Sequence, residues 1–138
     1  MSRENIEVVR RAYEAWNAGD FDAAAELLDP GVEWRMHPSI PETGTYQGID
    51  EVSRRLEDFM QSWEEFRVEV EELIDAGDRV VALTRFSGKS KGLGLELSGA
   101  AVDAQVWTFR DRRVIQVWMY SGTAEALEAV GLPDAPNR

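Results

Sequence analysis

Two polar side chains interrupt an apolar stretch near the C-terminus, at a spacing that places them on one face of a strand. Asp103 and Gln105 are followed at the same period of two by Trp107 and Phe109. A carboxylate and an amide on an apolar strand face are costly unless they are hydrogen-bonded or face a cavity. We predict that they face a cavity, where Asp103 acts as a catalytic acid or base and Gln105 orients a ligand carbonyl. The plain alternatives are a solvated Asp103 near the rim and a Gln105 that only satisfies its neighbours.

Arg85 separates a binding role from a catalytic role for Asp103. On the preceding strand, Arg85 alternates with Thr84 and Phe86. If the face that carries Arg85 is the inner one, the guanidinium points toward Asp103, holds it ionised and suits substrate anchoring. If Arg85 lies elsewhere, an apolar surround favours the protonated carboxyl, which then serves as an acid or base. Arg85 is therefore a candidate substrate-binding residue, with a structural ion pair as its alternative.

His37 is the only histidine, and it begins a segment, 37–48, that holds two prolines and two glycines. Loops of this length in compact domains are often lids or rims of sites. At a pocket rim His37 is a second candidate catalytic base, and an exposed loop histidine is the alternative. Tyr46 would close over the site from the same loop, or pack against the helix that follows. With one histidine and no cysteine we predict no metal site, and we expect no cofactor.

Large apolar side chains are expected to line the cavity. The chain holds five tryptophans among 138 residues, which is unusual and indicates a bulky interior. Aromatic walls with a few polar groups are typical of small-molecule sites, and the alternative is a core that these side chains fill. The predicted lining residues are Trp16, Trp34, Phe59, Trp63, Trp107 and Met119.

Periodicity and turn residues predict the elements that position these side chains. Apolar residues at helical spacing alternate with capping residues and glycines early in the chain, and β-branched runs dominate later. The predicted helices cover about 2–18, 20–29, 50–63 and 124–130, and the predicted strands about 32–36, 66–74, 79–87, 95–109 and 113–121. Helices followed by an antiparallel meander are typical of an α+β domain with helices on one face of a curved sheet.

Composition excludes several functional classes. The length suits one domain, 1–138, with a core of its own. A net charge of −11 argues against nucleic acid and against an anionic membrane surface as partners. The absence of cysteine excludes disulfides and thiol nucleophiles. Neither an apolar signal core nor a membrane-length run is present, so we expect a cytoplasmic protein.

Three stretches carry a resemblance to a known family. They are Tyr13–Asp22 joined to Leu27–Trp34, then Gly44–Gly48, and finally Val106–Asp111 with Ala124–Leu132. With the order of the elements, they make the chain similar to bacterial SnoaL-like proteins of the nuclear transport factor 2-like superfamily, over nearly its whole length. The resemblance implies a cystatin-like α+β cone, in which a curved antiparallel sheet wraps around the N-terminal helices. It also implies a deep pocket for a small apolar organic molecule, and a homodimer through the outer sheet face.

The resemblance does not extend to two known catalytic sets. Likeness to ketosteroid isomerase would need a tyrosine where this chain has Ala12, an aspartate near Arg35 and a second carboxyl at Gln105. Likeness to limonene epoxide hydrolases would need two carboxylates around Arg85, and these positions hold Ser87 and Met119. The closest likeness is to SnoaL-like proteins without a known reaction, some of which carry a histidine at the position of Gln105.

The connection between the last two strands decides which side chains share the inner face. A three-residue connection, 110–112, places Gln105 opposite Val117 and Asp103 opposite Met119. A two-residue connection would turn one strand over relative to this scheme. The family resemblance favours the first, and we adopt it.

The outer face of the same strands is also apolar. It carries Ala104, Val106 and Thr108 beside Trp118 and Tyr120. A sheet that is apolar on both faces needs a cover on both, which favours a homodimer through this surface.

Three functions remain open at this stage. The first is a cofactor-free enzyme of the cyclase or isomerase type that uses acid–base chemistry. The second is a binding module with the same pocket and no turnover. The third is a dimeric scaffold whose pocket is vestigial. The missing carboxylates keep the second function close to the first.

Overall fold

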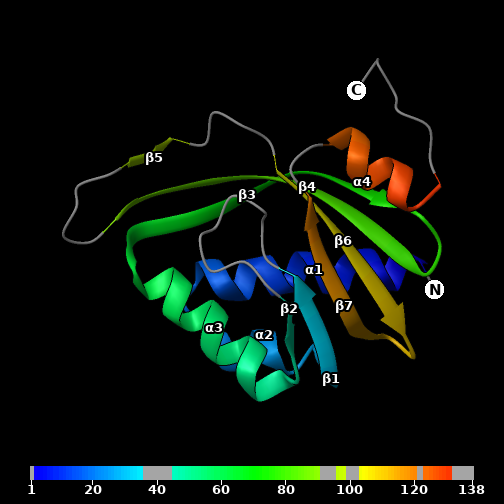
Figure 1. Ribbon diagram of the computed structural model, residues 1–138, viewed down its shortest axis with the longest axis horizontal. Coiled ribbons are helices and arrows are strands. Elements are labelled where there is room, and N and C mark those ends of the chain that lie inside the picture. Colours follow the sequence, from blue (N-terminus) through cyan, green and yellow to red (C-terminus); the bar gives the residue numbers. More distant parts are fainter. Residues whose placement is uncertain (1, 36–44, 91–95, 99–102, 121–122, 132–138) are drawn as a thin grey trace.

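A strongly curved sheet bends over the N-terminal helix in the computed structural model, which describes residues 2–35, 45–90, 96–98, 103–120 and 123–131 (Figure 1). The helices are α1 (Ser2–Asn17), α2 (Phe21–Ala25), α3 (Ile49–Gln61) and α4 (Thr123–Ala129). The strands are β1 (Leu28–Arg35), β2 (Thr45–Gln47), β3 (Trp63–Asp75), β4 (Arg79–Ser90), β5 (Glu96–Ser98), β6 (Asp103–Arg110) and β7 (Arg113–Tyr120). The predicted α+β class, with the sheet wrapped around N-terminal helices, is confirmed.

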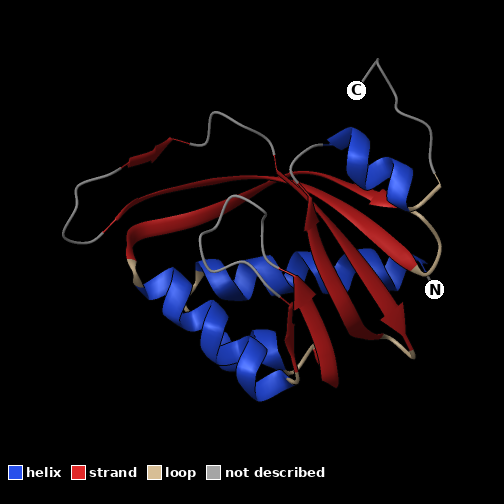
Figure 2. Cartoon of the chain, viewed as in Figure 1, coloured by secondary structure: helices blue, strands red, loops and turns tan. Residues whose placement is uncertain are grey.

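The strand order is β2-β1-β7-β6-β4-β3, and β5 pairs with β4 beside this path (Figure 2). Strands β3, β4, β6 and β7 form the antiparallel meander that the sequence predicts. Strand β1 joins this meander in parallel with β7, which the sequence analysis did not predict. This pairing brings Trp34 of β1 next to the strands that carry the polar candidates.

The end of α1 and the start of α2 lie where the sequence predicts, but the predicted end of the second helix and start of the first strand are wrong. Gly19 ends α1 with a φ of +76°, and the carboxylate of Asp20 caps α2 by accepting from the Ala23 N–H at 3.1 Å. The predicted second helix continues to residue 29, but α2 is short and Leu28 begins β1. Leu28 pairs with Val114 of β7, so the sheet provides a backbone partner for this residue. A helix could not continue here, because Pro30 lacks the backbone N–H that a helix needs.

Helix α3 begins and ends differently from the prediction. Gly48, with a φ of +92°, is the N-cap residue. Asp50 lies in the first turn, where its negative charge interacts favourably with the helix dipole. The helix ends before Ser62, whose hydroxyl donates to the Phe59 carbonyl at 2.6 Å. Trp63 therefore begins β3 and does not belong to the helical face on which it was predicted.

The β6–β7 hairpin has a two-residue turn, so the predicted three-residue connection is wrong. Asp111 and Arg112 have φ angles of 52° and 67°, the left-handed pair of a type I′ turn. Ile115 has no partner on β6 and forms a bulge in β7. Met119 consequently pairs with Gln105 and not with Asp103, a register shift of two residues. A shift of two keeps every side chain on its face, so Met119 still lies on the inner face as predicted.

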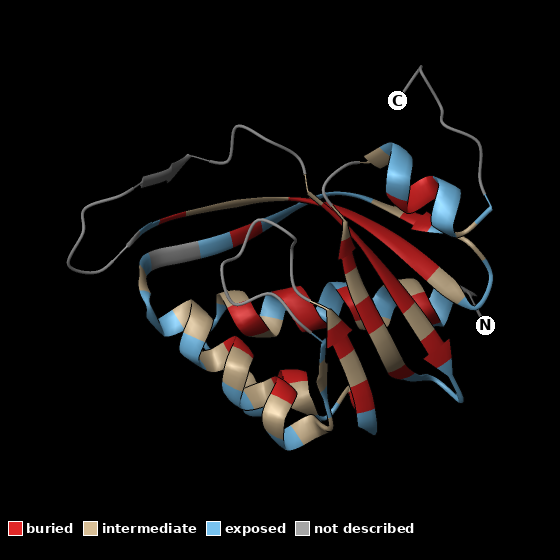
Figure 3. Ribbon diagram, viewed as in Figure 1, coloured by how far each residue is buried: buried red, intermediate tan, exposed pale blue. Residues whose placement is uncertain are grey.

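The buried residues form two clusters on opposite faces of the sheet. Figure 3 shows buried positions along the central strands, α1 and α4. The larger cluster lies between α1, α3 and the inner face, and it contains the three tryptophans of α1, β1 and β6. The smaller one lies under α4, where Ala126 and Leu127 pack against Val81, Leu83 and Val106. Helix α4 thus covers part of the outer face. No helix in the described parts of the chain has the length and apolar character to span a membrane.

The C-terminal end of α1 is attached to the sheet by one side chain. Asn17 donates through Nδ2 to the Val68 carbonyl and accepts at Oδ1 from the Val68 N–H, both at 2.8 Å. The side-chain amide of Asn17 thus bonds to both backbone groups of Val68 on β3, the last strand of the sheet, in the way that the backbone of a neighbouring strand would. This contact fixes the position of α1 relative to the inner face.

Candidate functional site

Four aromatic rings meet on the inner face of the sheet. Trp16 and Tyr13 come from successive turns of α1, Trp34 from β1 and Trp107 from β6. Ring centroids lie 5.5 Å apart for Trp16 and Trp34, and 5.7 Å for Trp34 and Trp107, with the rings edge to face. Tyr13 contacts Trp16 and Trp107, each at 5.5 Å. Trp34 and Trp107 approach because both pair with Val117 of the strand between them. These rings form the aromatic floor of the candidate site.

A buried hydrogen-bond network lies directly beside this aromatic floor. The Tyr13 hydroxyl donates to Gln105 Oε1 at 2.6 Å, and Gln105 Nε2 donates to Thr84 Oγ1 at 3.0 Å. Gln105 is 1% exposed and Thr84 is 0% exposed. Burial raises the pKa of Tyr13 well above its usual value, so the phenol stays neutral and remains a donor. The nearby indole of Trp107 opposes this shift less strongly.

Asp103 lies next to this Tyr13–Gln105–Thr84 network. It is two residues before Gln105 on the same face of β6, and its backbone partner on β4 is Thr84. Exposure increases along this face, from the fully buried Trp107 through Gln105 to the partly exposed Asp103. The carboxyl therefore occupies the more open end of a row whose other end is closed by aromatic rings.

Arg85 lies on the other face of β4. The inner residues are Val80, Ala82 and Thr84, while Val81 and Leu83 belong to the cluster under α4. The alternative in which the Arg85 face is the inner one is therefore wrong. Arg85 forms a partly exposed ion pair with Glu71 of β3. The physical reason is the strand alternation, which sends Arg85 outward once Thr84 bonds to Gln105.

Phe59 and Trp63 form a separate aromatic pair. Their ring centroids lie 6.3 Å apart, one at the end of α3 and the other at the start of β3. Both side chains are half-buried, unlike the aromatic floor. Met119, by contrast, is buried on the inner face beside Gln105.

Tyr46 lies on β2 and His37 outside the described residues. Tyr46 is half-buried, pairs with Trp34 across the β1–β2 ladder and has the Arg55 guanidinium 5.0 Å from its ring centroid. It therefore packs against the larger buried cluster, beside β1 and α3. His37 remains a prediction, because it falls within 36–44, which the structure does not describe.

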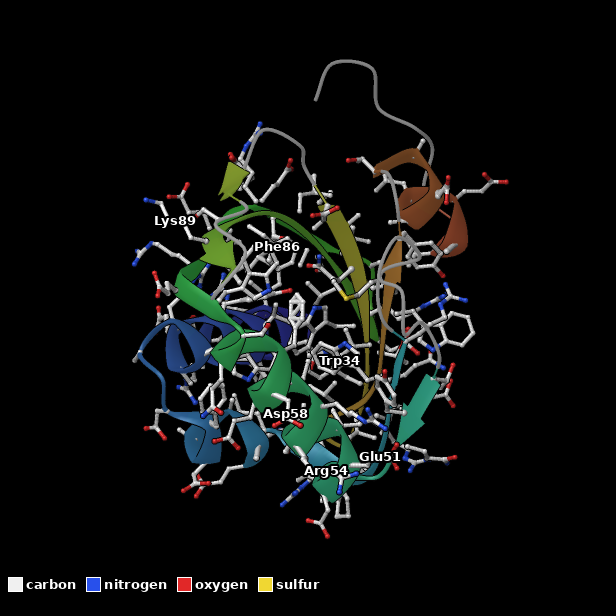
Figure 4. All side chains as sticks on the ribbon, turned by 60° about the vertical axis from the view of Figure 1, so that its left-hand side comes forward. Trp34, Glu51, Arg54, Asp58, Phe86 and Lys89 are labelled. Carbon is white, nitrogen blue, oxygen red and sulfur yellow. The ribbon has the colours of Figure 1, made fainter. Side chains whose placement is uncertain are left out.

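The indole N–H groups of Trp34 and Trp107 lack hydrogen-bond acceptors within the described structure. Figure 4 shows Trp34 on the inner side of the sheet, behind α3, with Phe86 approaching the same interior from β4. Arg54 and Asp58 project from the exposed side of α3. Across the described residues no group of three or more histidine or carboxylate side chains is placed to hold a metal ion.

Sequence reasoning missed Tyr13 and Thr84 as members of the site. The sequence could have indicated both. Tyr13 lies on the buried face of the first predicted helix, and a buried phenol hydroxyl needs a hydrogen-bond partner. Thr84 alternates with Arg85, so a correct choice of the inner face would have found it. The network joins α1, β4 and β6, and this juxtaposition is visible only in the folded chain.

Comparisons with known proteins agree with this architecture. The sequence profile described as SnoaL-like domain matches residues 9–117. A search of curated proteins gave no significant match.

Several solved structures are similar over almost their whole length. An NTF2-like protein of unknown function from Burkholderia pseudomallei is 27% identical, with 93% of this chain and 98% of that chain covered and a TM-score of 0.73. An NTF2-like protein from Burkholderia thailandensis is 25% identical, with 89% and 96% covered and a TM-score of 0.75. A candidate SnoaL-like polyketide cyclase from Jannaschia sp. CCS1 is 25% identical, with 96% and 95% covered and a TM-score of 0.72.

Proposed function

The chain belongs to the SnoaL-like domain family, and on that premise we propose that it binds a small, mostly apolar organic molecule on the inner face of its sheet. The proposed reaction is of the cyclase or isomerase type, uses acid–base chemistry without a cofactor, and takes place in the cytoplasm. The likeness to a candidate polyketide cyclase supports this class of chemistry. The fold alone would not, because the same architecture carries unrelated activities.

One observation carries the proposal: Asp103 lies at the open end of a row whose next members, Gln105 and Trp107, are buried. In this position the carboxylate would remove a proton from a carbon next to a ligand carbonyl and return it at another position of the same molecule. Such a transfer needs no oxidant, no metal and no second substrate. The Tyr13–Gln105–Thr84 network would hold the β6 face rigid beside it. His37 remains a second candidate base.

A specific observation favours the second function, binding without turnover. Gln105 was expected to orient a ligand carbonyl, yet its Oε1 accepts from Tyr13 and its Nε2 donates to Thr84. An amide engaged in this way polarises a ligand less effectively than an uncommitted donor. In this alternative the pocket would retain a ligand, and Asp103 would be a hydrated residue at the entrance that takes part in no reaction.

A ligand screen followed by a turnover assay separates the two functions. Polycyclic ketones, terpenoids and aromatic acids would be screened by thermal shift and native mass spectrometry, and each ligand incubated to detect product. We expect Asp103→Asn to keep ligand affinity and to lower turnover by about 100-fold or more. The control Glu69→Gln, at an exposed position on β3, should change neither. Binding with no product from any ligand would favour the binding module, and no binding at all would refute both.

We also propose a homodimer through the outer face of β1 and β7. Arg35 places its guanidinium 4.0 Å from the ring centroid of Trp118 and 5.0 Å from that of Tyr120. Trp118 donates to Glu33 at 3.0 Å. These side chains are only half-buried, and α4 packs over the neighbouring part of the face. A second copy would cover the remaining aromatic surface. The third function, a dimeric scaffold, requires only this contact.

A further inference from the structure

Two tryptophans of the aromatic floor hold a polar group that nothing in the described chain satisfies. Trp34 is 4% exposed and Trp107 is 0% exposed, and neither Nε1 has a hydrogen-bond partner among the described residues. Trp118 on the outer face differs, because its indole N–H donates to Glu33 at 3.0 Å. Both unsatisfied indole donors therefore lie on the inner face.

The two donors are not equivalent. The Trp107 N–H lies near the Tyr13 hydroxyl oxygen, close enough to affect its pKa, but it does not reach hydrogen-bond geometry. The Trp34 N–H has no hydrogen-bond partner among the described residues, and the rings of Trp16 and Trp107 lie edge to face against the Trp34 ring.

A buried donor without an acceptor destabilises the folded chain, and native proteins satisfy nearly all such groups. A phenylalanine at either position would supply aromatic surface without this penalty. An acceptor from outside the chain removes the penalty, and the aromatic walls favour a ring system as its carrier.

We propose that the ligand presents an oxygen acceptor, such as a carbonyl or enol oxygen, to the indole N–H of Trp34, with Trp107 as a second donor. This inference rests on the proposed small-molecule function and narrows its ligand class to flat, mostly apolar ring systems that carry such an oxygen. Pure hydrocarbons are disfavoured, because they would leave both donors buried and unpaired.

A matched pair of probes tests this assignment. 1-Tetralone and tetralin share a fused-ring skeleton and differ in one carbonyl group. Each would be titrated into protein labelled with ¹⁵N at the indole nitrogens, and the five tryptophan resonances would be assigned with Trp→Phe variants. We expect 1-tetralone to bind about tenfold more tightly than tetralin and to move the Trp34 indole proton downfield. Trp118 is the internal control, and its resonance should stay in place.

The variant Trp34→Phe sharpens the result. It should lower the affinity for 1-tetralone by about tenfold and leave the affinity for tetralin unchanged, because only the hydrogen bond between the indole N–H and the carbonyl is lost. If this variant does not fold, the shift is still read on the unaltered protein, with Trp34 assigned through its contacts with Trp16 and Trp107.

The outcomes distinguish the inference from the function on which it rests. Equal affinities and equal shifts for the two probes would overturn the acceptor requirement while leaving a small-molecule site in place. Failure of both probes to bind, together with an empty wider screen, would overturn the proposed function and this inference with it.

Discussion

At the scale of residues, the candidate site depends on polar groups that are buried but paired with one another. Tyr13, Gln105 and Thr84 come from three elements, and each supplies what its neighbour lacks. Removing one member of such a network lowers the free energy of unfolding, because the remaining buried polar groups keep their desolvation penalty without a partner. It therefore fixes the β6 face beside Asp103 more firmly than apolar packing alone would.

The buried phenol predicts a dependence of stability on pH at the alkaline end. Burial raises the pKa of Tyr13 above its usual value near 10.0, so the unfolded chain releases this proton first as the pH increases. The stabilising contribution is thus complete below about pH 10 and declines above it, by at most about 1.4 kcal/mol per pH unit. Urea unfolding between pH 8 and 11 would measure it.

Tyr13→Phe is the matched variant for this measurement. It should lower the free energy of unfolding by about 1–3 kcal/mol at pH 8, because Gln105 loses its donor. It should also make the decline above pH 10 shallower than in the unaltered protein. An identical slope in both proteins would contradict the assignment of the titration to Tyr13.

At the scale of elements, packing partners override local signals in several places. Leu28 and Trp63 both fit helical patterns, yet each begins a strand, where it pairs with a neighbouring strand of the sheet. The β6–β7 turn and the Ile115 bulge act together. Either alone would exchange the two faces of β7, and their combination preserves them.

The attachment of α1 to β3 leads to a prediction at this scale. Asn17→Ala removes both hydrogen bonds to the Val68 backbone and leaves a half-buried N–H and C=O without that partner. We expect a loss of about 1–3 kcal/mol in the free energy of unfolding, and faster hydrogen exchange at the Val68 amide. Urea denaturation and amide exchange would measure the two effects.

Arg10→Ala is a suitable control because it lies on the same helix. Arg10 pairs with Glu7 at the surface, where the two side chains are 48% and 49% exposed. Such a pair contributes little, so the change should stay within about 0.5 kcal/mol. Equal losses for Asn17→Ala and Arg10→Ala would show that the Asn17 contact has no special role.

At the scale of the whole molecule, the sheet is apolar on both faces and the two faces are covered differently. Helices α1 and α3 pack over the inner face, whereas α4 covers only part of the outer face. The half-buried cluster of Glu33, Arg35, Trp118 and Tyr120 remains beside α4. This asymmetry supports the proposed homodimer.

The proposed dimer predicts a change in association when the outer cluster is altered. Arg35→Glu removes the cation from the faces of Trp118 and Tyr120 and adds a charge beside Glu33. We expect a dimer for the unaltered chain and at least a tenfold weaker association for the variant, measured by sedimentation velocity. Lys89→Glu, the same charge change at an exposed position of β4, should leave association unaltered. A monomeric unaltered chain at micromolar concentrations would contradict the proposal.

The sequence by itself determined the kind of fold and which polar residues of β6 share one face. Periodicity and capping residues located α1, α3, α4 and the antiparallel meander, because helix and strand spacings repeat within a short window of residues. Period-two alternation also placed Asp103, Gln105 and Trp107 on one face, since adjacent side chains on a strand point to opposite sides. These are local rules, and local information suffices for them.

Only the tertiary structure decided what that polar row contacts. It brought Tyr13 to Gln105, turned Arg85 to the outer face and placed Trp34 beside Trp107 through the parallel pairing of β1 with β7. Each of these contacts joins residues far apart in the chain, and each depends on a register that a single bulge or turn residue can shift. The physical reason is that a strand pattern has two equivalent faces, and packing against the other elements selects the one that becomes buried.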